Sequence, residues 1–411
     1  MAMADLPDDV LREIARRLPC VADRDDAADV CTRWRAALAQ PLPLPAPPRP
    51  LPWLLLPSHD STRAWCFFCR SADACAICPK VCAATYGARY FGSYDGGWLF
   101  LAYGQTAKHA LVNVRALRPD LTVRFLPDVL LPAGRAEAEG HRAEDMVILA
   151  ATLSSPPGQN NCVAAGIVKR WQLLLGQRQP AFWLMGDEVA MDVVPDDLPC
   201  QPSLEVEDVV YHNGPFHFLT QGEHLRVCAP LFHQGGGLDS VSHFVCFFQA
   251  RERDDLTEPV IARYLVESHG DLLMVIRCGM QFASPYHRLP TSEFKIFKMM
   301  EKHVITDDGI HRVDYTWNEM ENLDGCMLFV GRGCSRAYNV AEYVNLGLEE
   351  GVFFMDEQVF NDEAMFFRDF RHRKYPGVDN GRWSEWGSHL VDPCFPKQPP
   401  SKVSSPVWLL P

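Results

Sequence analysis

Several absences restrict what this chain can do. It has no apolar run of the roughly 18 residues that a membrane-spanning helix needs, and its acidic N-terminus lacks the apolar core of a signal peptide. No Asn-x-Ser/Thr sequon occurs. Lys and Arg (39) are outnumbered by Asp and Glu (52), which gives a net charge of −13. Because phosphate binding needs a basic surface, we expect no nucleic acid as a partner. Because no apolar run is long enough to span a bilayer, we expect no membrane partner either. The dense basic cluster is interpreted as a solvated loop: Arg368, Arg371, Arg373 and Lys374.

The signatures of common enzymes are also missing. Neither Gly-x-Ser-x-Gly nor His-Glu-x-x-His occurs. The segment 331–336 (GRGCSR) begins like a dinucleotide-binding loop but lacks its third glycine, so a turn between strands is favoured. The candidate acids and bases lie in turn-like polar segments and are expected to be solvated: His59-Asp60, Asp196-Asp197, Asp307-Asp308 and His372. We therefore predict a non-enzymatic protein with no catalytic residue, cofactor or metal.

Cysteine usage indicates the compartment. The 15 cysteines, an odd number, are scattered through strand-like segments, as in reducing compartments where Cys is a small buried apolar residue. We therefore expect an intracellular protein, in the nucleus, the cytoplasm or both. One tighter group has a zinc-like spacing: Cys66, Cys69, Cys75, Cys78 and Cys82. Only five residues separate its two Cys-x-x-Cys pairs, and strand alternation would point Cys66 and Cys69 to opposite faces, so buried thiols are favoured.

The strongest positive signal lies in the first forty residues, which predict two short amphipathic helices. Pro7 suits a helix start, acidic Asp8 and Asp9 suit the N-terminal end of the helix dipole, and Pro19 ends the helix. A second helix is expected to begin near residues 23–26. Apolar residues recur at a spacing of three or four: Val10, Leu11, Ile14 and Leu18, then Ala27, Val30, Cys31, Trp34 and Leu38. So small a unit folds poorly alone and needs a partner for its remaining apolar surface.

These residues resemble an F-box. The family pattern of Leu-Pro, a Leu/Ile helix and a Val-Cys-x-x-Trp-Arg run is matched by Leu6, Pro7, Leu11, Ile14, Leu18, Val30 and Trp34. The resemblance implies that some of these residues pack the helices together and that others bind the Skp-type adaptor of a cullin ligase. Ala27 and Ala28 stand where the family has bulkier residues, which implies a weaker adaptor-facing surface. An ordinary helical hairpin packed on its own body is the alternative.

A proline-rich spacer separates this head from a β-rich body. Residues 41–50 (PLPLPAPPRP) contain six prolines and predict an extended, semi-rigid linker between domains 1–40 and 51–411. Short strand-like runs then alternate with turn signals such as Asp95-Gly96-Gly97 and His212-Asn213-Gly214. So many strands exceed a single sandwich, so we expect a mainly β fold: a C-terminal β-propeller of about six blades behind a small all-α head.

The two ends of the body are similar in sequence. Residues 52–57 (PWLLLP) open the body and residues 406–411 (PVWLLP) end the chain. Two such strands at opposite termini are expected to complete one blade and so hide both sheet edges. Chance similarity of two Leu- and Pro-rich runs is the alternative.

The body also resembles the KIB-type domain, a kelch-like propeller of unknown function that follows the F-box in many plant proteins. The matching blocks are residues 92–99, 206–214, 264–275, 294–298, 328–331 and 351–356. Together the two resemblances imply a substrate receptor of an SCF-type E3 ubiquitin ligase, with the head on a Skp-type adaptor and the propeller on an unknown target protein. A non-ligase protein-binding propeller with a degenerate F-box and, less favoured, a propeller enzyme are the alternatives. Trp383, Trp386 and Tyr375 are candidate binding anchors, although packing inside the fold is favoured.

Overall fold

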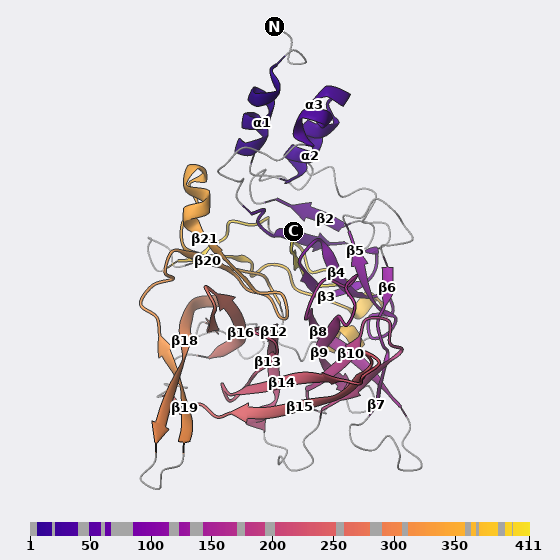
Figure 1. The fold of residues 1–411 in the computed structure, drawn as a ribbon, viewed down its shortest axis with the longest axis vertical. Coiled ribbons are helices and arrows are strands. Elements are labelled where there is room, and N and C mark those ends of the chain that lie inside the picture. Colours follow the sequence, from indigo (N-terminus) through magenta and orange to yellow (C-terminus); the bar gives the residue numbers. More distant parts are fainter. Residues whose placement is uncertain are drawn as a thin grey trace.

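The computed structural model describes most of the 411 residues (Figure 1). The described ranges are 6–18, 21–39, 49–58, 62–66, 85–114, 123–131, 143–170, 177–193, 202–251, 259–279, 290–305, 311–357, 363–366, 370–384, 391–396 and 398–411. The predicted spacer lies outside the described residues up to position 48.

Three short helices form the head: α1 (Asp8–Arg17), α2 (Val21–Asp29) and α3 (Thr32–Leu38). Helix α1 starts after Pro7, as predicted, and Glu13 binds Arg16 at 2.6 Å within it. The prediction of one continuous second helix is wrong, because Cys31 is extended (φ −165°, ψ 170°) and separates α2 from α3. This extended residue turns the chain so that Trp34 enters the head core.

In the remaining described chain, strands are the main regular elements. The first two sheets are β2 (Thr62–Trp65), β1 (Trp53–Pro57), β25 (Val407–Leu409), and β3 (Arg89–Tyr94), β4 (Trp98–Ala102), β5 (His109–Asn113), β6 (Val123–Phe125). A closed barrel follows, of β10 (Gln179–Leu184), β11 (Val189–Asp192), β7 (Val129–Leu131), β8 (Glu144–Leu153) and β9 (Val163–Arg170). Two four-stranded sheets come next: β12 (Val206–Tyr211), β13 (Phe216–Thr220), β14 (Leu225–Phe232), β15 (Leu238–Cys246), and β16 (Val260–Ser268), β17 (Asp271–Gly279), β18 (Thr291–Ile305), β19 (His311–Glu319).

The last sheet mixes parallel and antiparallel pairs. Its order is β21 (Arg336–Asn339), β20 (Cys326–Phe329), β22 (Gly351–Phe354), β23 (Gly381–Trp383) and β24 (Val391–Asp392), with β20 parallel to β22. Short 3₁₀ helices lie in the connections: η4 (Pro202–Leu204), η5 (Val340–Leu346), η6 (Glu363–Phe366) and η7 (Phe370–His372).

The sheets follow one another around a ring. Strand β25 contacts β3, β3 contacts β8, β8 contacts β12, β12 contacts β16, and β16 contacts β21. This arrangement is a β-propeller, and the predicted mainly β body is confirmed. The blade count differs from the predicted value of about six: over the described residues, five sheets are open blades. The strands β7 to β11 form a small closed barrel instead of an open blade, with β7 paired to both β8 and β11.

The two ends of the body close the ring, as their similar sequences predict. Strand β1 pairs antiparallel with β25, with Trp53 opposite Leu409, and Leu54 opposite Trp408. Trp408 is fully buried, and its indole Nε1 donates to the carbonyl oxygen of Val330 at 2.9 Å. The C-terminal strand therefore joins the first blade to the last.

Arginine side chains link neighbouring blades through main-chain carbonyls. Arg89 Nη2 on β3 donates to Ile148 O on β8 at 2.7 Å. Arg178 Nε donates to Val206 O at 2.8 Å, and Arg277 Nη1 donates to Met355 O at 2.7 Å. Each guanidinium is buried, so these bonds satisfy charged donors that would otherwise be costly inside the ring.

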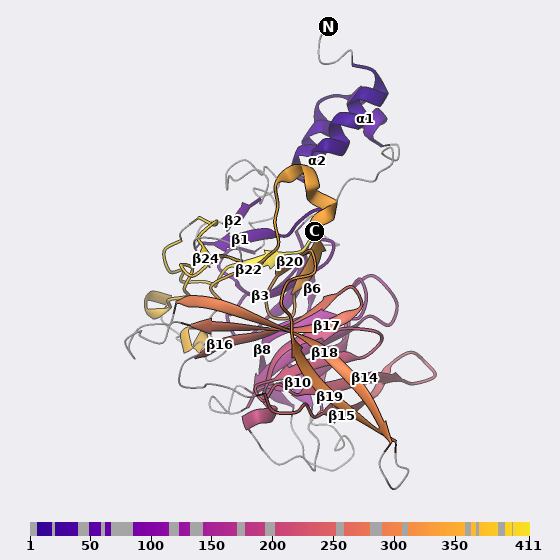
Figure 2. The same cartoon turned by 90° about the vertical axis from the view of Figure 1, so that its left-hand side faces the viewer.

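The head lies beyond one end of the ring in both views (Figures 1 and 2). At this end, η5 of the last sheet holds the chain where it enters the body: Tyr343 Oη donates to Arg49 O at 2.7 Å. No helix among the described residues is long and apolar enough to cross a membrane.

Candidate protein-interaction surfaces

The head has its own small core. Leu11, Ala27, Trp34 and Ala37 are buried together, and half-buried apolar side chains pack around them: Leu6, Leu18, Cys31 and Leu38. The structure thus separates the roles of the seven F-box-like residues. Leu11 and Trp34 form the core, and Leu6 and Leu18 support it.

Other apolar residues of the head face outward. The side chain of Val10 is 38% exposed and that of Val30 is 61% exposed, while Ile14 is half-buried and Pro7 is exposed. The F-box resemblance implies that Ala27 belongs to the adaptor-facing surface, but Ala27 is buried in the head core, so that expectation is wrong for this residue. Val10 and Val30 therefore leave apolar surface exposed to solvent among the described residues of the head.

The turn between β20 and β21 lies on the axis of the ring. A Cβ added to Gly333 would lie 2.6 Å from Ala151 O on β8, and one added to Gly92 on β3 would lie 3.5 Å from Arg332 O. The Arg332 guanidinium lies 6.0 Å from the ring centre of Tyr264 on β16. The sequence correctly predicts a turn here, but nothing in it indicates that residues 330–335, the axial turn, contact the inner strands of several blades.

Asp208 on β12 fixes the axial turn. Its carboxylate accepts hydrogen bonds from the main-chain N–H groups of Gly333 at 2.6 Å, Leu265 at 2.7 Å and Val209 at 2.8 Å. Complete burial raises the pKa of Asp208 to about 7, although the three N–H donors favour the ionised form. One carboxylate thus joins three blades. In the sequence it is one of two adjacent acidic residues, Glu207 and Asp208, at the start of a strand-like run.

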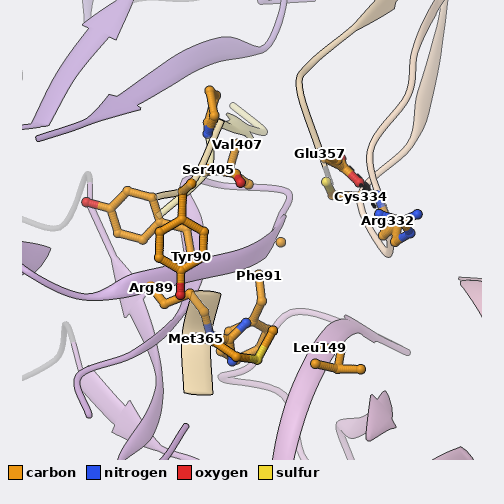
Figure 3. A pocket seen from close by; sticks show the side chains of 13 residues that line it. Arg89, Tyr90, Phe91, Leu149, Arg332, Cys334, Glu357, Met365, Ser405 and Val407 are labelled. Atoms are coloured by element: carbon orange, nitrogen blue, oxygen red, sulfur yellow. Dashed lines mark hydrogen bonds and ion pairs between the residues drawn. The ribbon is translucent and has the colours of Figure 1, made fainter. Parts of the chain in front are cut away.

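A cavity of about 80 Å³ lies beside the axial turn (Figure 3). Its walls include Arg89 and Phe91 of β3, Leu149 of β8, and Arg332 with Glu357 from the last sheet. Burial raises the pKa of Glu357, whereas the Arg332 guanidinium and main-chain N–H, at 3.5 and 3.2 Å, favour its ionised form. The volume is well below the ~300 Å³ of small ligand pockets.

The remaining sequence candidates fall into three groups. Trp383 and Tyr375 are buried, which confirms that they pack inside the fold, and His372 is exposed. Cys66 is buried, and within the described part of the chain no three His, Cys, Asp or Glu side chains form a possible metal site. Several candidates lie outside the described residues: His59, Asp60, Cys69, Cys75, Cys78, Cys82, Asp196, Asp197, Asp307, Asp308, Arg368 and Trp386.

The fold and its surfaces define a β-propeller that carries a separate helical head and is closed by its own terminal strand. The chain belongs to the KIB1-4 beta-propeller family, whose family model matches residues 70–377. No curated protein matches it. Among solved structures, the crystal structure of the N-terminal domain of Nup159 is 10% identical with a TM-score of 0.32; the match spans 65% of this chain and 58% of that chain.

Proposed function

We propose that this protein is the substrate-recognition subunit of an SCF-type E3 ubiquitin ligase. In this proposal the head is an F-box that binds a Skp-type adaptor, and the propeller binds a target protein. The protein itself is non-catalytic: it holds the target near the ubiquitin-conjugating enzyme, so proximity is its contribution and other subunits supply the chemistry. It acts inside the cell, in the nucleus, the cytoplasm or both.

The observation that carries this proposal is that some apolar side chains of the head are buried in its core while others are exposed to solvent. The F-box-like residues Leu11 and Trp34 are buried and hold three helices together, whereas Val10 and Val30 keep apolar surface exposed to solvent. Exposed apolar side chains on a small, separately cored unit favour a protein partner. The closed propeller behind it offers a rigid platform for a second protein.

Binding to a purified Skp-type adaptor tests the proposal. In the full-length protein, Val10→Asp with Val30→Asp places two charges on the exposed apolar surface without touching the core. We expect this double variant to weaken adaptor binding by at least tenfold in isothermal titration calorimetry, because apolar anchors dominate such interfaces. Leu11 is unsuitable for this test, since it is fully buried and its substitution would unfold the head.

The control is Val378→Asp, which changes a valine of the body that is 58% exposed. It should bind the adaptor as the wild type does. If the wild type has no affinity for the adaptor, or if both variants bind equally well, the ligase proposal is wrong. The alternative would then be a protein-binding propeller that acts outside a ligase.

A further inference from the structure

Half of one long strand has no neighbouring strand on its outer edge within the described residues. Strand β18 pairs with β17 along residues 291–298, whereas β19 pairs with β18 only from Phe297 onward. Residues 291–296 therefore have no strand on their outer side within the described parts of the chain. Met320 N donates to Ile296 O at 2.9 Å, so the main chain of Ile296 faces this outer side. Because main-chain groups alternate in direction along a strand, the N–H and C=O of Phe294 face the same side.

A cavity of about 250 Å³ opens at this edge. It lies between residues 293–296 of β18, the segment that follows β19, and Trp383 of β23. Phe294, Leu323 and Trp383 are buried and form its apolar part, with the Phe294 and Trp383 rings 6.0 Å apart. The Trp383 side chain is 7% exposed, and its indole Nε1 has no hydrogen-bond partner among the described residues. A buried donor of this kind gains free energy when a carbonyl oxygen binds it.

The residues around the cavity carry an excess of negative charge. Among the described residues that line the cavity, Glu293 lies 3.8 Å from the ammonium of Lys295, and the carboxylates of Glu319 and Glu350 add two further negative charges. Glu319 is exposed, and Glu350 also accepts a hydrogen bond from Gly325 N at 3.0 Å. Charge complementarity therefore favours a cationic partner at this edge.

We propose that this edge binds an extended, positively charged segment of a partner protein, which adds as a strand beside residues 291–296 and places one side chain in the cavity. The inference rests on the proposed function, since that partner would be the target of the ligase. It places target recognition on the outer rim of the propeller, between the blade of β18 and the blade of β23. Near the axis of the ring, residues 330–335 lie close to β8, and the cavity beside them is only about 80 Å³ in volume.

Short synthetic peptides test the inference on the full-length protein. The probe is a fluorescein-labelled peptide in which lysine and valine alternate, and its binding is followed by fluorescence anisotropy. A second peptide carries N-methyl groups on alternate residues, which removes the N–H groups of one edge, and a third replaces lysine with glutamate. We expect the N-methylated peptide to bind at least tenfold more weakly, because strand addition depends on main-chain hydrogen bonds. The glutamate peptide should not bind.

Protein variants locate the site. Glu319→Gln should weaken binding of the lysine peptide about three- to tenfold, and Lys295→Gln should strengthen it, because the two changes act oppositely on the local charge. Glu188→Gln, at an exposed site outside this cavity, changes the net charge as Glu319→Gln does and should leave binding unchanged. The inference is overturned if the lysine peptide does not bind, if N-methylation has no effect, or if Glu188→Gln weakens binding equally. Adaptor binding measured on the same samples separates failure of this site from failure of the ligase proposal.

Discussion

At the scale of single residues, the most informative side chain is a buried carboxylate at the centre of the ring. Asp208 accepts three main-chain hydrogen bonds that come from its own blade, from β16 and from the axial turn. Each of these N–H groups would be left without an acceptor if the carboxylate were removed. Such losses cost about 1–3 kcal/mol for each buried group.

Asp208→Ala is therefore expected to lower the free energy of unfolding by about 3 kcal/mol or more. Urea denaturation followed by circular dichroism measures this difference. Asp239→Ala, which removes an exposed aspartate of the same blade, is the matched control and should change stability by less than about 0.5 kcal/mol. Equal stability of the two variants would show that the three donors find other acceptors.

A second buried group, His217 on β13, makes stability depend on pH. Burial lowers its pKa to about 4, so the folded protein keeps the imidazole neutral where the unfolded chain, near pKa 6.5, takes up a proton. The unfolded state then binds more protons between pH 6.5 and 4, and His217 destabilises the fold as pH falls through this window. Asp208, whose pKa is raised to about 7, acts in the opposite direction between about pH 4 and 7.

His217→Gln removes the histidine contribution and leaves that of Asp208. On going from pH 7 to pH 5, the wild type is expected to lose about 2 kcal/mol more stability than this variant. Urea midpoints of both proteins at the two pH values give the difference. Parallel pH profiles would mean that the imidazole is protonated in the folded protein as readily as in the unfolded one.

At the scale of elements, the axial turn depends on one glycine for two reasons. Gly333 has φ +71°, a conformation that disfavours side chains, and a Cβ there would lie 2.6 Å from the carbonyl oxygen of Ala151. Gly325 has a similar φ of +75° but has nothing within 4 Å of the added Cβ. The two glycines therefore separate backbone strain from steric contact.

Gly333→Ala is expected to lower the free energy of unfolding by at least about 2 kcal/mol more than Gly325→Ala. The change at Gly325 adds only backbone strain, of about 1 kcal/mol. Thermal unfolding by differential scanning calorimetry compares the two variants. If both lose the same stability, the axial turn can move away from β8 without cost, and its role in holding the blades together is refuted.

At the scale of the whole molecule, the ring is closed by three residues of β25. Pairing of β25 with β1 covers an edge that would otherwise offer unpaired main-chain groups to other chains. Trp408 contributes packing as well, since its buried ring contacts Phe329 and Phe395. Closure and packing are thus two separable contributions of the same strand.

Deletion of residues 406–411 should both destabilise the ring and expose the edge of β1, so we expect oligomers in size-exclusion chromatography. Trp408→Ala keeps the strand but leaves a cavity, and it should remain monomeric while losing about 3–5 kcal/mol of stability. A monomeric deletion variant would contradict the proposed role of β25 in covering the edge.

The sequence by itself determined the helical head, the mainly β propeller body and the closure of that body by its two ends. These features depend on local periodicity, on proline and glycine positions and on a repeated strand motif, all of which are visible along the chain. The interruption at Cys31 was not predictable, because the apolar spacing of Ala27, Cys31 and Trp34 continues unbroken across it.

Only the tertiary structure decided which side chains face solvent and which hold the fold together. Val10 and Leu11 are adjacent and both apolar, yet Leu11 is buried against Trp34 of another helix while Val10 remains 38% exposed. The axial turn, the role of Asp208 and the open edge of β18 likewise arise from contacts between residues far apart in sequence. Such contacts depend on how whole blades pack around a ring, and no local pattern in the chain specifies that packing.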